Sequence, residues 1–577
     1  MAQQVKNGNP SSTEPGKEMS MEMRLLVAFL LMGAVMFLTP YFFKGPPPVP
    51  PKKAPTAAAS LTPAPTPPGA QEHTAPNPAA PSARATKEQP QPPFIVDTDL
   101  FHVEFSNQGA TVRSWQLKKY LGNDGKPLEL VNAAAKLDFP FALYFPKEKP
   151  TANVNWAYYT ETDAPDGLGV SFEYSDGHTV VHKTFRFEKN SYRSHVSSQV
   201  TVDGRPIPNL IEWRGGFGDL TVANPSGAQR TLYFNTPDNK LVEQNAKAAK
   251  DGPITSSGDF AFAGIADTYF AAVFLPDAGN TMQVMTFSDT VRTLMDEKPA
   301  PFPGTAVSAS PANRFSLFVG PKDLDLLKRM NPKLEAVVDF GWLSIIAKPL
   351  FLAVNFLNDA FVHNFGWSIV LVTIIIYIVM FPLRLTSMKS MRKMQALKPQ
   401  VDQITQKYKN LKFNDPRKAE QQQETMALYK KHGVNPMGGC LPTLISLLLI
   451  IPFYRVFQVA VEMRGAHWLW VTDLSQPEHL PIKILPVAMI VTQFLTQKMM
   501  PTPGVDPNQQ RMMMFMPLIF GFMFYNFPSG LVLYYLTGNL VSIGQQWFFN
   551  RTEVAVEASR SVQPPPKKKE RQEVARD

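Results

Sequence analysis

The apolar positions of this chain fall into two patterns, long continuous runs and short alternating ones. Leu25–Phe43 is one continuous run, and the stretch from Trp367 to Phe549 holds several more. A helix of about 20 apolar residues crosses the hydrocarbon core of a bilayer. The long runs therefore predict membrane spans, which we expect at 25–43, 367–383, 441–461, 482–500, 512–527 and 530–549.

The first run is expected to remain as a transmembrane anchor, preceded by a cytoplasmic segment, 1–24. Its 19 residues exceed the apolar core of a typical signal peptide, and no small-residue cleavage motif follows it, although Arg24 precedes it as in such peptides. Residues 44–93 then carry 16 prolines among 50 residues, which is typical of an extended, unpacked linker. The anchor and linker therefore tether the rest of the chain to the membrane.

Alternating patterns begin at Phe94 and continue to about Val319. Segments such as HTVVHKTFRFEK, RSHVSSQVTVDG and DTYFAAVFLPDAG alternate apolar and polar side chains, at least in part, between turns rich in Gly, Asp and Pro. The pattern predicts a β-sandwich, large enough to bury a core without disulfides. LDLLKRMNPKLEAVVD adds a helix, so we expect one domain over 94–335.

Candidate chemistry is sparse along the chain. The only cysteine, Cys440, has no partner for a disulfide or a metal site, and no phosphate-binding glycine loop is present. The sandwich holds four histidines, the last three on alternating patterns without an adjacent acidic or glycine-rich cluster: His102, His178, His182 and His195. We therefore expect surface histidines, no catalytic residue, no cofactor and no metal, in a protein that is not an enzyme.

Residues 336–366 are apolar but interrupted by five polar or helix-breaking residues, Lys348, Pro349, Asn355, Asn358 and Asp359. A helix that carries such groups on one face lies along the outer membrane surface rather than across the bilayer. We therefore expect an interfacial amphipathic helix over 336–366.

Lysine and arginine counts orient the chain. Arg384–Lys431 holds twelve of them against four acidic residues, whereas Glu462–Leu480 holds only Arg464, and the tail after Asn550 is basic again. Because cytoplasmic loops carry the excess of positive residues, both termini, segment 384–433, loop 501–511 and the basic tail 550–577 are placed in the cytoplasm. The sandwich and loop 462–481 are then periplasmic, on a multi-pass protein of a bacterial inner membrane.

Segment 384–433 is predicted to be a helical hairpin. Apolar residues recur at helical spacing through its first half, Asp415-Pro416 starts a second helix, and Gly433 ends it. These recurring apolar residues either pack the two arms of the hairpin together or form an adaptable contact surface. The second alternative is suggested by methionine, which re-packs around varied partners. The methionines concerned are Met388, Met391 and Met394.

Polar side chains recur inside the predicted spans. They are Thr373, Tyr377, Thr443, Ser446, Arg455, Gln493, Asn526, Tyr534, Asn539, Gln545 and Gln546. Polar groups at membrane depth are costly and face a protein interior or a wet cavity. Hydrogen bonds between helices account for some of the Ser and Thr, whereas the number of Gln, Asn, Tyr and Arg favours a hydrated cavity.

Several motifs resemble the YidC family of membrane protein insertases in its Gram-negative form. They are VNPMGGCLP (Val434–Pro442), FPSGLVLYYLTGNLVSIGQQ (Phe527–Gln546), DFGWL followed by KPLF, and QKMMPT (Gln497–Thr502). The resemblance covers essentially the whole chain and implies a multi-domain membrane protein. Its parts would be an α-helical membrane core of five spans plus an N-terminal anchor helix, a cytoplasmic helical hairpin, and a large periplasmic β-supersandwich domain, similar to sugar epimerases without their chemistry.

The resemblance also implies a function. Members insert hydrophobic segments of nascent proteins into the inner membrane through a hydrophilic groove and act as folding chaperones, alone or with the Sec translocon. The implied partners are nascent membrane proteins, the ribosome, the Sec translocon and the phospholipid bilayer, with no small-molecule substrate. The implied groove lining is Thr373, Tyr377, Arg384, Thr443, Ser446, Gln493, Tyr534 and Tyr535, with client contacts at the three hairpin methionines.

One position departs from the family pattern. The family usually places a basic residue five positions before the proline that ends the second span, and counting back from Pro382 that position is Tyr377. Arg384 is expected on nearly the same helical face, about 10.5 Å nearer the cytoplasm. Arg455, toward the periplasmic end of its span, is the other candidate for the positive charge of the groove.

Two other functions fit parts of the chain. A small-solute transporter would use the polar spans, but it predicts repeated halves, which the sequence lacks. A membrane-tethered periplasmic carbohydrate-binding protein would use the sandwich but leaves the hairpin without a role.

Overall fold

The computed structural model describes residues 89–222, 224–293, 298–341, 343–408, 417–434, 441–499 and 507–562. The predicted anchor, most of the linker and the end of the basic tail lie outside these residues. The described chain forms two compact units, each considered by itself. The larger unit comprises Ala80–Met380, Thr443–Thr496 and Pro517–Asp577, and the smaller comprises Phe381–Pro442 and Gln497–Met516.

The larger unit opens with a β-domain, which we define as Phe94–Pro321. Its strands are β1 (Phe94–Asp97), β2 (Phe101–Ser106), β3 (Thr111–Leu121), β4 (Pro127–Glu129), β5 (Ala142–Tyr144), β6 (Thr160–Asp163), β7 (Gly169–Ser175), β8 (Thr179–Phe187), β9 (Arg193–Val202), β10 (Arg205–Pro206), β11 (Leu210–Trp213), β12 (Arg230–Asn235), β13 (Lys240–Gln244), β14 (Ile254–Gly258), β15 (Phe260–Ala266), β16 (Phe270–Pro276), β17 (Thr281–Val291), β18 (Ala300–Ser310) and β19 (Asn313–Pro321). Two single turns of helix interrupt them, η1 (Ala133–Ala135) and α2 (Pro225–Ala228).

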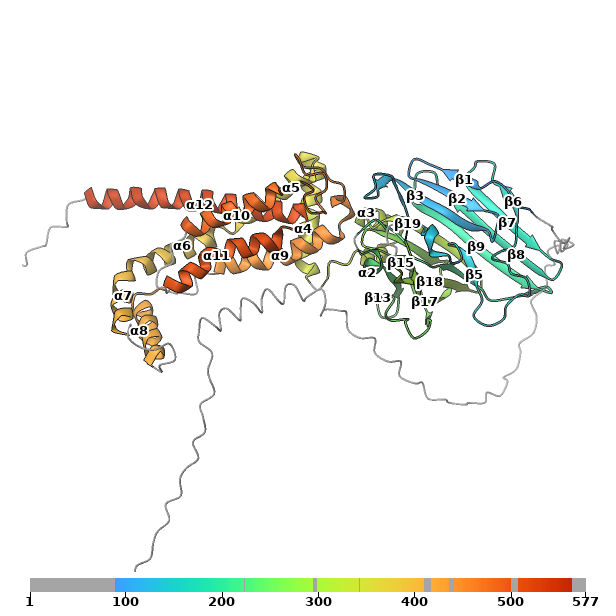
Figure 1. Cartoon of the computed structure of the whole chain (residues 1–577), viewed down its shortest axis with the longest axis horizontal. Helices are drawn as coiled ribbons and strands as arrows, with labels where there is room; N and C mark the ends of the chain where they lie inside the picture. The colour runs from blue at the N-terminus through green and yellow to red at the C-terminus, as the bar shows by residue number, and fades with distance from the viewer. Residues whose placement is uncertain are drawn as a thin grey trace, which may run out of the picture. The chain divides into compact units, whose positions relative to one another are not determined.

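These strands form three antiparallel sheets, which Figure 1 shows layered against one another. One sheet runs β1-β2-β3-β4, and another runs β14-β17-β18-β11-β5. The largest runs β13-β12-β15-β16-β19-β9-β8-β7-β6, with β10 added beside β9. In β8 every second side chain is buried, as the alternating sequence predicts.

Aromatic side chains fill the space between the sheets. The rings of Phe105 (β2) and Phe185 (β8) lie 4.8 Å apart between centroids, which joins the smallest sheet to the largest. The rings of Trp115 (β3) and Trp213 (β11) lie 6.2 Å apart, and both are fully buried. Such rings bury a large apolar area each. The predicted β-sandwich is therefore confirmed.

Short helices follow the last strand: α3 (Leu324–Met330), η2 (Pro332–Val337), α4 (Ser344–Leu357) and the π-helical turn η3 (Asn358–Val362). The Asp323 carboxylate begins α3 by accepting hydrogen bonds from the N–H groups of Asp325 and Leu326, both at 2.9 Å. One face of α4 is buried through Phe351 and Val354, while Phe356 on the other face is exposed.

The remaining helices of the larger unit form what we call the helical bundle. It contains α5 (Phe365–Val379), α9 (Leu441–Val459), the 3₁₀ turn η5 (Val461–Met463), α10 (Ile484–Met499), the end of α11 (Pro507–Phe524) and α12 (Ser529–Val562). Helix α12 continues 12 residues past Asn550, where the sequence predicted the basic tail to begin. The residues RTEVAVEASRSV are rich in good helix formers, so nothing in them ends the helix.

By length and apolarity, one described helix, Ser344–Val362, could cross a membrane unaided, and α5 together with α6 (Phe381–Ala396) would form a second span if the bent pair acted as one. The shorter apolar segments are Leu448–Val459, Ile484–Met499 and Met514–Phe524. Thus the helix that is most span-like by length lies where the sequence predicted an interfacial helix.

The second predicted span is interrupted. The sequence predicted one span to Leu383, but α5 ends at Val379 and α6 begins at Phe381. Pro382 is the second residue of α6, in the first turn of a helix, where a missing N–H costs little. Tyr377 and Arg384 therefore lie on different helices. The expectation that they share one helical face is wrong.

In the smaller unit, the segment predicted to form a hairpin begins with two helices, α6 and α7 (Lys398–Lys407), rather than one. The second arm is α8 (Arg417–Lys431). Asp415-Pro416, predicted to start it, lies outside the described residues. Beyond α8, Gly433 adopts a φ of 63°, and the N–H of Val434 donates to the Tyr429 carbonyl at 2.9 Å. This glycine-terminated helix end matches the stop predicted at Gly433.

Candidate functional site

Polar side chains gather where α12 packs against its neighbours. Tyr534 is 1% exposed, its ring stacks on Phe453 of α9 at 4.0 Å, and its hydroxyl is buried without a hydrogen-bond partner among the described residues. Tyr535 is half-buried, with its ring 5.3 Å from Phe524 of α11. Two of the predicted lining residues thus lie on the contacts of α12 with α9 and α11.

Helix α5 meets α12 through a close approach. A Cβ added at Gly538 would lie 2.4 Å from the hydroxyl oxygen of Tyr377, so only glycine leaves room for this ring. The Gln545 amide Nε2 donates to the Tyr377 backbone carbonyl at 3.2 Å, and its Oε1 is buried without a partner in the described part of the chain. Thr373, also predicted, is buried and donates to the Ile369 carbonyl of its own helix at 2.7 Å.

Helix α10 contributes a hydrogen bond between helices. Asn539 of α12 donates from Nδ2 to the Thr492 hydroxyl at 3.3 Å. The predicted residues Gln493 and Ser446 are both half-buried. The side chain of Thr443 lies outside the described residues. Asn539 and Gln545 therefore fit the interhelical explanation of the polar spans, while the hydroxyl of Tyr534 does not.

The two candidates for the positive charge differ in their surroundings. Arg455 of α9 donates from Nη2 to the carbonyl of Asp339 at 3.1 Å and to its carboxylate at 3.2 Å. This arginine therefore pairs outside the bundle, with the segment that leads from the β-domain to α4. Arg384 is half-buried on α6, in the smaller unit.

The three predicted contact methionines are largely covered. Met388 is buried, Met391 is half-buried, and Met394 packs against a cluster made by Leu397, Val401, Tyr429 and Val434. Met394 thus packs within the smaller unit, and contact of the three methionines with clients stays a prediction. Met426 on α8 is exposed. Helical spacing in the first arm of the hairpin could not identify this residue, because it lies on the second arm.

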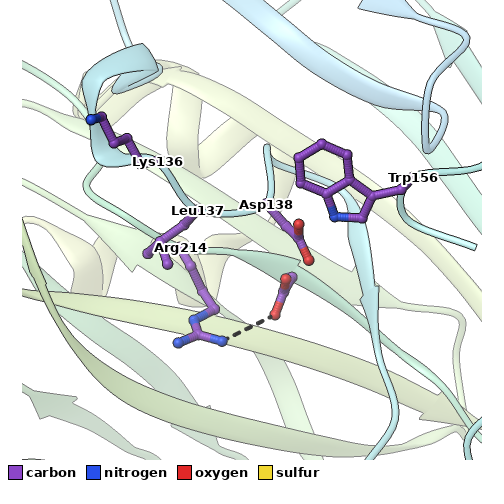
Figure 2. A pocket seen from close by; sticks show the side chains of 6 residues that line it. Lys136, Leu137, Asp138, Trp156 and Arg214 are labelled. Carbon is purple, nitrogen blue, oxygen red and sulfur yellow. Dashed lines mark ion pairs between the residues drawn. The ribbon is translucent and has the colours of Figure 1, made fainter. Parts of the chain in front are cut away.

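The β-domain has a small polar pocket of about 200 Å³ (Figure 2). Its lining residues are Lys136, Leu137, Asp138, Trp156, Glu212 and Arg214. Glu212 is buried, and its Oε2 lies 3.8 Å from the Arg214 guanidinium without a hydrogen bond. Burial raises the pKa of Glu212 to about 7.

None of the four histidines lines that pocket, and sequence reasoning missed Glu212 because no local motif marks it. The histidines pair with surface carboxylates instead, as His178 does with Asp203 at 2.8 Å.

These features define a multi-domain membrane protein whose β-domain is joined to an apolar bundle with buried polar groups. Residues 356–556 match the family described as 60Kd inner membrane protein, and residues 94–353 match the YidC periplasmic domain. The chain is 34% identical over 475 residues to membrane protein insertase YidC of Syntrophus aciditrophicus, covering 79% of this chain and 85% of that protein. It is 32% identical over 561 residues to the insertase YidC of Geotalea daltonii, covering 92% and 99%.

A solved structure of an active YidC insertase with its first transmembrane domain resolved gives a TM-score of 0.35 at 20% identity, covering 91% of this chain and 99% of that chain. Family membership therefore rests on the sequence relatives. The chain belongs to the YidC family of membrane protein insertases. It is accordingly an inner-membrane protein whose β-domain is periplasmic.

Proposed function

We propose that this chain inserts hydrophobic segments of nascent membrane proteins along the polar face that α12 presents to α5 and α9. The observation that carries this proposal is the buried Tyr534 hydroxyl, which has no partner among the described residues. An unpartnered polar group in a region of low dielectric is costly. When α12 and α9 separate to admit a client, the hydrophilic end of that client supplies the missing partner.

The energy for insertion comes from the client. Moving about 20 apolar residues out of water into lipid is strongly favourable, so the protein needs only to lower the cost of carrying polar ends across. We place α5, α9, α10, α11 and α12 as the five core spans, with the hairpin and C-terminus in the cytoplasm. The ribosome and the Sec translocon are the proposed partners on the client's route.

Helix α4 is proposed to lie at the outer membrane surface, although α4 and η3 together, at 19 residues, are long enough for a span. Its Lys348 ammonium pairs with Glu335 in η2, which leads out of the β-domain, and Pro349 interrupts its hydrogen bonding. The exposed side chains Ile345 and Phe356 would enter the lipid from the side.

The test of the proposal compares two deletions in cells depleted of their own insertase. We expect removal of Leu385–Lys431 to abolish insertion of a small client with an acidic translocated tail, and removal of most of the β-domain to be far less damaging. Normal insertion after the first deletion would overturn the proposal.

A point variant tests the face itself. Tyr534→Phe removes only the unpartnered hydroxyl and should slow insertion by a few fold while leaving the protein as stable or more so. Tyr525→Phe is the matched control, because that hydroxyl donates to the Pro481 carbonyl at 3.5 Å outside the bundle helices. Equal rates for both variants would exclude Tyr534 from the client path.

We also propose that Arg384, rather than Arg455, supplies the positive charge that attracts acidic client tails, because it lies only seven positions after Tyr377, where the family usually carries a basic residue. Arg384→Ala should slow insertion of a client with an acidic tail, and adding Tyr377→Arg should restore it. Arg455→Ala should leave the rate unchanged. If only Arg455→Ala slows insertion, the positive charge is supplied by Arg455 on α9 and the proposal is wrong.

A further inference from the structure

The loop that follows α9 inserts one arginine into the β-domain. The Arg464 side chain is 8% exposed, and its Nη2 lies 2.5 Å from the carboxylate of Asp219, which is 2% exposed. The same nitrogen donates to the Leu121 carbonyl at 2.8 Å. The guanidinium carbon lies 5.2 Å from the ring centroid of Phe270. A loop residue is thus held by charge, by a carbonyl and by an aromatic face.

The β-domain builds this binding site from its own residues. Asp219 accepts hydrogen bonds from the Thr221 N–H at 2.9 Å and its hydroxyl at 2.6 Å, which orient the carboxylate. The Asp219 N–H donates to buried Asp267 at 2.6 Å, and Asp267 also accepts from the N–H of Phe270 at 2.6 Å. The carboxylate and the ring that hold Arg464 are therefore positioned by one network.

The same loop holds the ends of several bundle helices together. Its Trp468 packs on Trp367 of α5, with ring centroids 5.6 Å apart, and any Cβ at Gly366 would collide with it. Glu478 accepts hydrogen bonds from the first N–H groups of α10, such as Leu485 at 2.9 Å. The N–H of Gly530 in α12 donates to the Leu474 carbonyl at 2.9 Å. The loop therefore touches α5, α10 and α12.

We propose that the β-domain braces this end of the bundle through Arg464, holding the loop 461–478 closed over α5, α10 and α12 while clients pass. This inference rests on the proposed insertase function. The β-domain then has a structural role in the bundle, since the position of the loop depends on a binding site in the β-domain.

Because the pair of Arg464 and Asp219 is buried, the proposal leads to a counterintuitive prediction. Removing one partner of a buried ion pair leaves the other charge in an apolar site without compensation. Asp219→Ala removes the brace and also leaves Arg464 buried without its partner, whereas deletion of the whole β-domain removes the brace but returns Arg464 to water, where it needs no partner. A single substitution in the β-domain should therefore harm insertion more than loss of the entire domain.

The experiment uses the full chain in cells depleted of their own insertase, with a small client as substrate. We expect Asp219→Ala to reduce the insertion rate by roughly tenfold and Asp219→Ala with Arg464→Met to recover part of it, because the unpaired charge is gone although the brace is not restored. Asp166→Ala is the matched control, since Asp166 pairs with Arg186 at the same 2.5 Å on the exposed surface of the same domain and should change nothing measurable.

A second readout follows the loop directly. Hydrogen exchange of 461–478 in the purified full-length protein should quicken in Asp219→Ala and in Asp219→Asn, which preserves the side-chain shape, but not in Asp166→Ala. Faster exchange with normal insertion would overturn the brace and leave the insertase function standing. Unchanged hydrogen exchange in both Asp219 variants would also overturn the brace. Normal insertion after removal of Leu385–Lys431 would instead overturn the insertase function on which the brace rests.

Discussion

The β-domain and the helical bundle differ in how many of their large apolar side chains they expose. In the β-domain Trp115 and Trp213 are fully buried, whereas Phe522 and Ile519 of α11 are 84% and 67% exposed. Soluble proteins rarely expose contiguous apolar patches of this kind. The same preference for leaving water thus produces an aromatic core in one region and an apolar outer face in the other, because the second region folds in lipid.

The largest effect is expected from truncating one aromatic side chain in each region. Trp115→Ala should lower the free energy of unfolding of the β-domain by about 3–5 kcal/mol, because it leaves a cavity in the core. Phe522→Ala removes a similar side chain from an exposed position and should change bundle stability by less than about 0.5 kcal/mol. The measurements are urea unfolding of Phe94–Val319, which we expect to be soluble and monomeric alone, and detergent-induced unfolding of the full chain. Equal losses of unfolding free energy in Trp115→Ala and Phe522→Ala would contradict the difference between the two regions.

Placing a charged residue on an exposed surface of each region tests whether that surface faces lipid or water. Ile519→Asp should disfavour membrane insertion of α11 by about 2.5–3.5 kcal/mol, the cost of an aspartate near the bilayer centre. Ile95→Asp, at an exposed site of β1, should stay within about 0.5 kcal/mol because it faces water. Protease protection of the membrane-integrated chain reports the first, and urea unfolding reports the second. If Ile519→Asp integrates fully, the outer face of α11 does not contact lipid.

A smaller effect concerns how tightly α5 and α12 pack against each other in the bundle. Gly538→Ala places a methyl group 2.4 Å from the Tyr377 hydroxyl oxygen and should cost about 1–3 kcal/mol by overpacking. Adding Tyr377→Leu should recover part of that loss, because the ring no longer fills the space. Detergent-induced unfolding measures both. A gain in stability from Gly538→Ala alone would show that α5 and α12 are not in close contact.

The last prediction concerns one buried acidic group of the β-domain. Burial raises the pKa of Glu212 from 4.5 to about 7, so the folded domain binds this proton more tightly than the unfolded chain does. Its contribution is complete below pH 4.5 and is lost as pH rises through 7. Stability of the isolated domain should therefore fall between these two pH values by at most about 1.4 kcal/mol per pH unit.

Urea unfolding of Glu212→Gln across this range should give a flatter profile than the parent domain. An identical slope in the two proteins would mean that Glu212 titrates normally, with water reaching its carboxyl group.

Periodicity was sufficient to predict the β-domain. The alternating segments around β8 and β9 became paired strands because their apolar side chains have one buried face to occupy, with Val181 opposite Val200. The contact between Arg464 and Asp219 could not be predicted in this way, because the two residues lie 245 positions apart and no local sequence pattern relates them. Only the folded β-domain brings Leu121, Asp219 and Phe270 to one place.

The bundle shows why site residues were harder to predict than spans. The apolar run around Tyr534 predicted a helix with a polar residue in it, and α12 is that helix, but whether a hydroxyl is satisfied depends on neighbouring helices. Asn539 finds Thr492 on α10, while Tyr534 stacks on Phe453 without finding an acceptor among the described residues. Pro382 was misread for a related reason, because a proline is compatible both with the end of one helix and with the first turn of the next.

The contact between α12 and the loop before α10 also sets an order of events during synthesis. The Ser529 hydroxyl donates to the Gln476 carbonyl at 2.8 Å, across 53 residues of sequence, and the chain emerges from the ribosome N-terminus first. The loop must therefore wait for the last helix before its carbonyl groups are paired. Until translation has passed Gly530, each newly made copy of this insertase is itself an unfinished membrane protein, and chains terminated earlier should be preferred targets for membrane proteases.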